Sequence, residues 1–182
     1  MADQPTAAQY LRRVRRIAPG DLVGRADEWS ALTAFCTSEE SPPCLWWEGA
    51  PWAGKSALMA WFVTHPPRGV QPVAFFVTSR VADQSTRAAF LVATIAQLSA
   101  LLNEPVPALA LGFKDLIFQE LLARAAASGR QNQQRLVLVL DGWDEESSAD
   151  RHRIAYGGAG LPGRTSAAGT RHRRPERAPP PG

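Results

Sequence analysis

The strongest constraint on the fold is a glycine-rich stretch of eight residues between two apolar segments. The stretch matches the pattern G-x-x-x-x-G-K-[ST] at every fixed position, and its residues are Gly49, Ala50, Pro51, Trp52, Ala53, Gly54, Lys55 and Ser56. The apolar run 44–47 before it predicts a buried strand, and residues 55–63 after it predict a buried helix. A strand, a glycine turn and a helix in this order predict a phosphate-binding loop in an α/β fold.

Each fixed position of this loop has a chemical reason. Gly49 and Gly54 let the backbone turn so that successive N–H groups face one anion. Lys55 places an ammonium against the outer phosphates, Ser56 offers a hydroxyl to Mg²⁺, and the following helix adds its positive N-terminal end. We therefore expect all eight residues to bind a nucleoside triphosphate, ATP in the first instance, with Mg²⁺ held through Ser56.

A second motif lies about 90 residues further along the chain. The continuously apolar run 136–140 predicts a strand buried on both faces. Such a strand delivers Asp141 to the carboxyl-terminal edge of a parallel sheet, where α/β folds place ligands. We expect Asp141 to hold the magnesium through water, and Asp144 and Glu145 to orient or deprotonate the attacking water as catalytic residues.

Periodicity and turn residues predict the remaining elements. The carboxylate of Asp27 is expected to cap the second helix, and the helix that begins at Gly112 is expected to end before Ser128 and Gly129. Alternation of strands and helices indicates a parallel sheet with flanking helices, which is the three-layer α/β/α arrangement of a P-loop NTPase. The predicted helices cover residues 7–17, 27–35, 55–63, 86–102 and 112–127, and the predicted strands 44–47, 73–77 and 136–140.

Composition divides the chain into three parts. Residues 1–20 form a basic amphipathic helix, residues 21–150 a partial P-loop domain, and residues 151–182 a tail rich in arginine, proline and glycine that is expected to be disordered. The tail has seven arginines and one acidic residue, whereas the whole chain has a net charge of +3. The body is therefore net acidic and argues against nucleic acid as a partner.

Other function classes lack support in the composition. No apolar run is long enough to span a bilayer or to form the core of a signal peptide. Cys36 and Cys44 do not have a metal or redox spacing, so we expect reduced thiols and a cytoplasmic location. The alternative function is a non-enzymatic interaction module, or a nucleic-acid or anionic-membrane binder, that uses the two basic ends of the chain.

The motifs together resemble a known class of proteins. The sequences GAPWAGKS and LVLVLDGWDEE resemble the STAND class of signalling P-loop ATPases, and within it the bacterial NACHT-like proteins. Residues 22–28 resemble the Gly-Arg box that precedes the STAND core, and this resemblance places Arg25 close to the bound nucleotide. The resemblance covers about residues 20–146 and implies a nucleotide-controlled signalling switch that binds partner domains or associates with itself.

The chain departs from this class after Asp150. The class has a further strand between the loop strand and the strand that carries Asp141, followed by helical and winged-helix segments, and none is recognisable here. Without that strand, the sheet would have a gap at its centre or would pair differently. The composition of the tail is typical of GC-rich DNA read in a wrong frame, which predicts a truncated or frameshifted relative. We therefore expect a slow ATPase at most.

Overall fold

The computed structural model describes residues 6–50, 52–77, 86–108, 112–142 and 170–172. The predicted alternation of helices and strands is present, with some boundaries shifted by a few residues. The elements are α1 (Ala7–Ile17), α2 (Ala26–Thr37), β1 (Leu45–Trp47), α3 (Lys55–Thr64), β2 (Val70–Phe76), α4 (Arg87–Leu101), α5 (Lys114–Gln131), β3 (Arg135–Asp141) and β4 (Thr170–His172).

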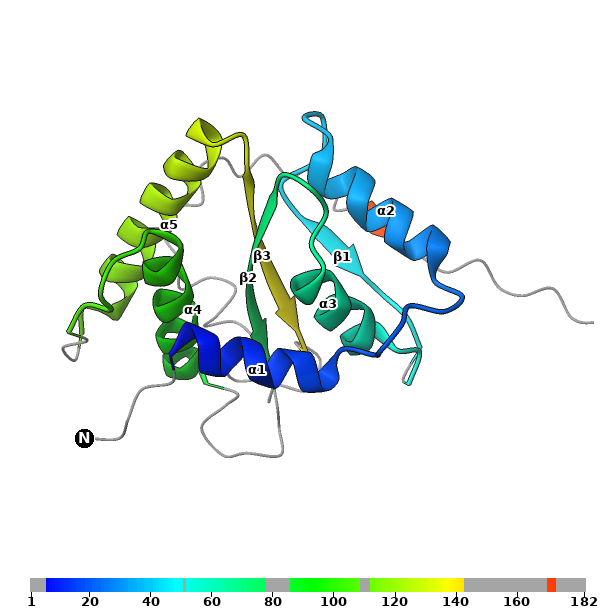
Figure 1. The fold of residues 1–182 in the computed structure, drawn as a ribbon, viewed down its shortest axis with the longest axis horizontal. Coiled ribbons are helices and arrows are strands. Elements are labelled where there is room, and N and C mark those ends of the chain that lie inside the picture. Colours follow the sequence, from blue (N-terminus) through cyan, green and yellow to red (C-terminus); the bar gives the residue numbers. More distant parts are fainter. Residues whose placement is uncertain (1–5, 51, 78–85, 109–111, 143–169, 173–182) are drawn as a thin grey trace, which may run out of the picture.

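Strands β2 and β3 form a parallel pair in which Val70 lies opposite Arg135 and Phe76 opposite Asp141. Helices α4 and α5 lie on one side of this pair in Figure 1, and α3 and α2 lie on the other side. Helix α3 contacts both strands and also α1, which explains why its Leu58 and Phe62 are buried. The α/β class with a parallel sheet and flanking helices is therefore confirmed, whereas the three-layer P-loop architecture stays a prediction.

The strands do not form one continuous sheet in the described part of the chain. Strand β1 pairs in parallel with β4, and this pair is separate from β2–β3. The arrangement agrees with the expected gap beside the loop strand and with its altered pairing. Strand β4 lies in the tail that composition predicts to be disordered, so that prediction does not hold for residues 170–172. The other residues of the tail lie outside the described residues.

The gap corrects the prediction that residues 136–140 are buried on both faces. Val139 is buried, but Leu138 and Leu140 on the opposite face are 37% and 41% exposed. Trp46 of β1, also predicted to be buried, is 53% exposed. A continuously apolar strand needs cover on both faces, and the elements packed against β3 leave the face of Leu138 and Leu140 partly open.

The outer edge of β2 is closed by two buried side chains rather than by another strand. The amide of Gln97 accepts a hydrogen bond from Ala74 N (3.0 Å) and donates one to Ala74 O (2.9 Å). The hydroxyl of Tyr10 accepts a hydrogen bond from Phe76 N at 2.7 Å. Since unpaired backbone groups are costly in a protein interior, these contacts fix α4 and α1 against the edge of the sheet.

Helix α1 is part of the core. Thr6 and Gln9 form a reciprocal capping box at its start, which the sequence analysis did not identify. Tyr10 and Val14 are buried, whereas Arg12, Arg13, Arg15 and Arg16 are exposed. Because the apolar stripe packs inward, it is not free to insert into a bilayer surface. Within the described residues, no helix has the length and apolar character that a membrane span requires.

Two predicted helix ends were wrong. Arg25, and not Asp27, precedes the first turn of α2, and its side chain makes no capping bond. Asp27 lies inside that turn, where its charge still suits the helix dipole. Helix α5 continues through Ser128 and Gly129 to Gln131, because one internal glycine costs only about 1 kcal/mol.

The far end of α2 is tied to β3. The guanidinium Nη1 of Arg135 donates to Ser38 O at 2.6 Å and lies 3.4 Å from Phe35 O. Carbonyl groups at a helix C-terminus lack intrahelical partners, and a cation there is favourable. Arg135 therefore joins α2, the helix that precedes β1 in the sequence, to the sheet that contains β3.

We predict that Tyr10→Phe lowers the free energy of unfolding by about 1–2 kcal/mol at pH 7, because the buried Phe76 N–H loses its acceptor. Burial raises the pKa of Tyr10 to about 12. The folded state therefore holds the phenol proton more tightly than the unfolded state, whose pKa is about 10. This contribution to stability is complete below pH 10 and is lost between pH 10 and 12.

Chemical denaturation of both proteins from pH 7 to pH 12 measures this effect. The parent should lose stability faster than the variant above pH 10, by up to about 3 kcal/mol in total. Burial also raises the pKa of the Cys36 thiol to about 11. Because both proteins contain Cys36, its contribution cancels in the difference between them. If the free energy of unfolding fell with pH in the same way in both proteins, the Tyr10 hydroxyl would not be the buried group that loses its proton between pH 10 and 12.

Candidate functional site

The glycine-rich loop connects β1 to α3 and closes on itself. Nζ of Lys55 donates to Gly49 O at 2.9 Å and to Ala50 O at 3.4 Å, so the lysine crosses back over the loop. A Cβ built on Gly49 would lie 3.6 Å from the lysine side chain and 3.7 Å from Cβ of Ala53. The loop therefore places an ammonium group beside the start of a helix, and both are features that can bind an anion.

The start of α3 supplies further groups for such an anion. Gly54 occupies the N-cap position in a left-handed conformation, with φ of 77°. The N–H groups in the first turn of a helix have no intrahelical acceptor. Ser56 is exposed, and so are Gly49 and Ala50, which leaves this side of the loop open to solvent.

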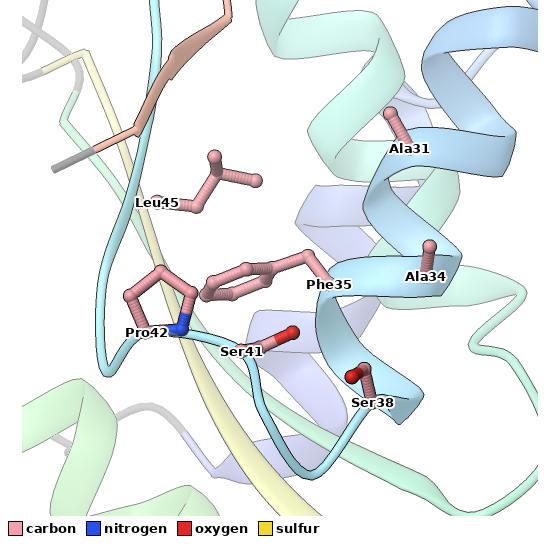
Figure 2. A pocket seen from close by; sticks show the side chains of 7 residues that line it. All are labelled: Ala31, Ala34, Phe35, Ser38, Ser41, Pro42 and Leu45. Carbon is pink, nitrogen blue, oxygen red and sulfur yellow. The ribbon is translucent and has the colours of Figure 1, made fainter.

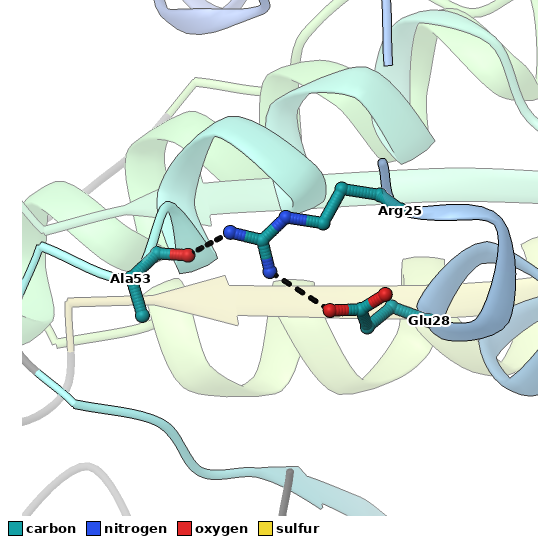
Figure 3. Close-up of polar contacts among 3 residues, drawn as sticks. All are labelled: Arg25, Glu28 and Ala53. Atoms are coloured by element: carbon teal, nitrogen blue, oxygen red, sulfur yellow. Dashed lines mark hydrogen bonds and ion pairs between the residues drawn. The ribbon is translucent and has the colours of Figure 1, made fainter. Parts of the chain in front are cut away.

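Arg25, which the resemblance places close to the nucleotide, lies against the loop and contacts its backbone. Its Nη2 donates to Ala53 O, and its Nη1 lies 3.0 Å from Oε1 of Glu28 (Figure 3). The sequence analysis did not assign a role to Glu28. A signal for it was present, because an acidic residue three positions after an arginine on a helix falls within reach of that arginine.

Trp52 has an unusual position in the loop. Its side chain is 98% exposed, and its backbone has φ of 63°. A large residue in the left-handed region is an uncommon, strained choice. No pattern in the sequence indicated this conformation, because the motif leaves that position unspecified.

Asp141 ends β3 at the carboxyl-terminal edge of the parallel pair, as predicted. Val77 N donates to Asp141 O at 2.8 Å, which holds the backbone of this residue against the end of β2. Gly142 follows with φ of 79°, and a Cβ on it would lie 2.8 Å from Val77 O. Only glycine fits this close turn, which accounts for the Asp-Gly pair in the motif.

The predicted site residues divide into three groups. The structure brings Arg25, Gly49, Ala50, Ala53, Gly54 and Lys55 into direct proximity, and Trp52 and Ser56 lie in the same segment of the chain. Asp141 belongs to the other sheet, and helix α3, which packs against β3, is the element that connects it to the loop. Pro51, Asp144 and Glu145 lie outside the described residues.

Two oxygen-bearing side chains are the candidates for a magnesium site. In the described ranges, no group of three or more His, Cys, Asp or Glu side chains converges. Magnesium bound with a nucleotide commonly uses one or two protein oxygens, with water and phosphate completing its shell. The exposed hydroxyl of Ser56 and the partly buried carboxylate of Asp141 are oxygens of this kind.

A cavity of about 270 Å³ lies away from this loop. Figure 2 shows it between the C-terminal half of α2 and the segment that enters β1, whereas the loop follows the other end of β1. No charged residue lines it, so it does not suit phosphate. Its lining residues are Ala31, Ala34, Phe35, Ser38, Ser41, Pro42 and Leu45.

Comparison with known proteins identifies one family. Residues 28–156 match the family model described as Nephrocystin 3, N-terminal, which is more than half of the 182 residues. The matched segment contains the glycine-rich loop and Asp141, and it ends before β4. No curated protein and no solved structure matches the chain.

We predict that Gly142→Ala lowers the free energy of unfolding by at least about 2 kcal/mol, since a side chain adds left-handed strain to a backbone clash. Urea denaturation measures the loss. Gly20→Ala is the matched control, because no atom lies within 4 Å of a Cβ at that position. Equal stability of the two variants would show that the turn after Asp141 is not constrained.

Proposed function

The chain belongs to the nephrocystin 3 N-terminal family, and on that premise we propose that it binds the triphosphate of a nucleotide, with Mg²⁺, through residues 49–56. ATP is the proposed nucleotide. Within this proposal, Lys55 and the N–H groups at the start of α3 hold the phosphates, and Ser56 and Asp141 hold the magnesium.

The observation that carries the proposal is the position of Lys55. Its ammonium lies between the two ends of the loop and donates to neutral carbonyl groups of Gly49 and Ala50. A phosphate oxygen is a stronger acceptor for an ammonium than a carbonyl group is. The ammonium can therefore exchange these contacts for phosphate by a small rotation of its own side chain.

Binding and hydrolysis place different demands on this chain. The loop, Arg25 and α3 are held together locally, so phosphate binding needs little from the rest of the sheet. Hydrolysis requires the attacking water, its acidic residue and the magnesium ligand to be in register with the phosphates. Asp144 and Glu145 are the proposed catalytic residues, and the separation of β1 from β3 opposes their alignment with the loop.

The finer proposal is that this nucleotide-binding unit acts as a switch of the STAND class, NACHT-like, in a larger signalling system. Support comes from the loop and the Asp-Gly turn in one matched segment, and from the place of Arg25 beside the loop. Self-association or partner domains would then respond to the bound nucleotide. The alternative function is an interaction or nucleic-acid-binding module that uses the basic ends of the chain. In the described part of the chain, its only support is the exposed arginines of α1.

We predict that Lys55→Ala weakens Mg-ATP binding at least tenfold, or about 1.4 kcal/mol, because it removes the cation that faces the phosphates. Isothermal titration calorimetry measures the affinity. Lys114→Ala is the matched control, since Lys114 is the only other lysine and also begins a helix. If Lys55→Ala binds Mg-ATP as tightly as the parent and the control, the proposal fails.

We also predict that turnover of Mg-ATP stays below about 1 s⁻¹, the low end for phosphoryl-transfer enzymes. The reason is that, among the described residues, no strand pairing joins the loop strand to the strand that ends at Asp141. A phosphate-release assay at saturating Mg-ATP measures it, with Lys55→Ala as the blank. Faster turnover that Lys55→Ala abolishes would show that the catalytic groups are aligned despite the gap.

A further inference from the structure

We propose that Arg25 is a positioning residue, which sets the shape of the phosphate loop through the carbonyl of Ala53, and that Glu28 holds Arg25 in place. This inference rests on the proposed function, because it concerns the same loop. It differs from the role that the resemblance implies, in which the arginine lies close to the nucleotide itself.

Arg25 acts on the orientation of one peptide group in the loop. Arg25 Nη2 donates to Ala53 O, the carbonyl in the peptide that joins Ala53 to Gly54. A trans peptide is planar, so its C=O and N–H point in opposite directions. Because Arg25 holds this carbonyl, the N–H of Gly54 is turned away from Arg25.

The residues that follow this peptide lead into α3. Gly54 has φ of 77° and is the N-cap of α3, directly before Lys55. A left-handed residue before a helical turn places successive N–H groups around one point, which is the backbone arrangement of an anion site. Arg25 lies close to this glycine, because a Cβ there would be only 3.0 Å from Nη2. Arg25 thus acts on the residue at which the anion site begins.

Glu28 makes the contact that holds Arg25. Oε1 of Glu28 lies 3.0 Å from Nη1, and the two side chains are only 23% and 19% exposed. Figure 3 shows the guanidinium between the two oxygens, with one terminal nitrogen directed at each. Glu28 lies in the first turn of α2, where the helix dipole also favours its charge. Loop, arginine and helix α2 therefore form one connected unit.

The two roles for Arg25 predict opposite effects of Glu28. If the guanidinium bound phosphate directly, removal of the Glu28 charge would release a cation and strengthen binding. If Arg25 positions the loop, the same change leaves the arginine less restrained and weakens binding. Glu28→Gln separates these outcomes with almost no change of shape.

The experiment is calorimetry of the full chain with Mg-ATP and, separately, with magnesium tripolyphosphate. We expect Arg25→Ala to weaken both ligands about tenfold, the scale on which residues that orient binding groups act. We expect Glu28→Gln to weaken both about threefold, and to have no further effect in the Arg25→Ala background, because Glu28 acts through Arg25. Asp115→Asn is the matched control, since it breaks the Arg87–Asp115 pair (3.0 Å) between α4 and α5.

Tighter binding by Glu28→Gln would overturn the positioning role in favour of direct contact with phosphate. Additive effects of the two substitutions would overturn the link between them. The same affinity in Glu28→Gln, Asp115→Asn and the parent would overturn the inference while leaving the phosphate site intact. Absence of binding by the parent would instead overturn the proposed function. Thermal unfolding of each variant identifies loss of fold, and Glu28→Gln tests the idea even where Arg25→Ala does not fold.

Discussion

The closed outer edge of β2 is the constraint on which the rest of the structure depends. A pair of strands exposes backbone groups on both outer edges, and those groups must be covered or paired. At the edge of β2, the side chain of Gln97 forms hydrogen bonds with both backbone groups of Ala74, and the hydroxyl of Tyr10 accepts one from the N–H of Phe76. These two side chains come from α4 and α1, so satisfying the edge also decides where both helices lie.

The closed edge determines how the loop is supported. Because β2 cannot accept another strand beside Gln97 and Tyr10, further pairing is open only on the side of β3. Strand β1 does not pair there in the described residues, and its partner is β4. Support for the loop therefore comes from helices. Helix α3 packs against β2 and β3, and Arg135 ties the end of α2 to the start of β3.

With this form of support, the shape of the loop and the position of Asp141 relative to the loop depend on different contacts. The loop is closed by its own lysine and is braced by Arg25 from the start of α2. Its shape depends on contacts within the loop itself and on one contact from Arg25, which lies 28 positions before Ala53. The position of Asp141 relative to the loop depends on packing between two separate sheets. Under the proposed function, we therefore expect phosphate binding to tolerate changes elsewhere in the fold better than hydrolysis would.

The sequence by itself determined the local structure: most of the helices and strands, the loop before α3, and the aspartate at the end of β3. Such features depend on side-chain periodicity and on the few residues that fit a turn. The expectation for Arg25 had a different origin, namely the resemblance of residues 22–28 to a family motif. Only the tertiary structure decided that Glu28 holds Arg25, that Tyr10 closes an edge, and that Leu138 is partly exposed. These facts depend on which strands pair and which helices cover them. An apolar run indicates that a strand prefers cover, but neighbours distant in sequence decide whether cover is present.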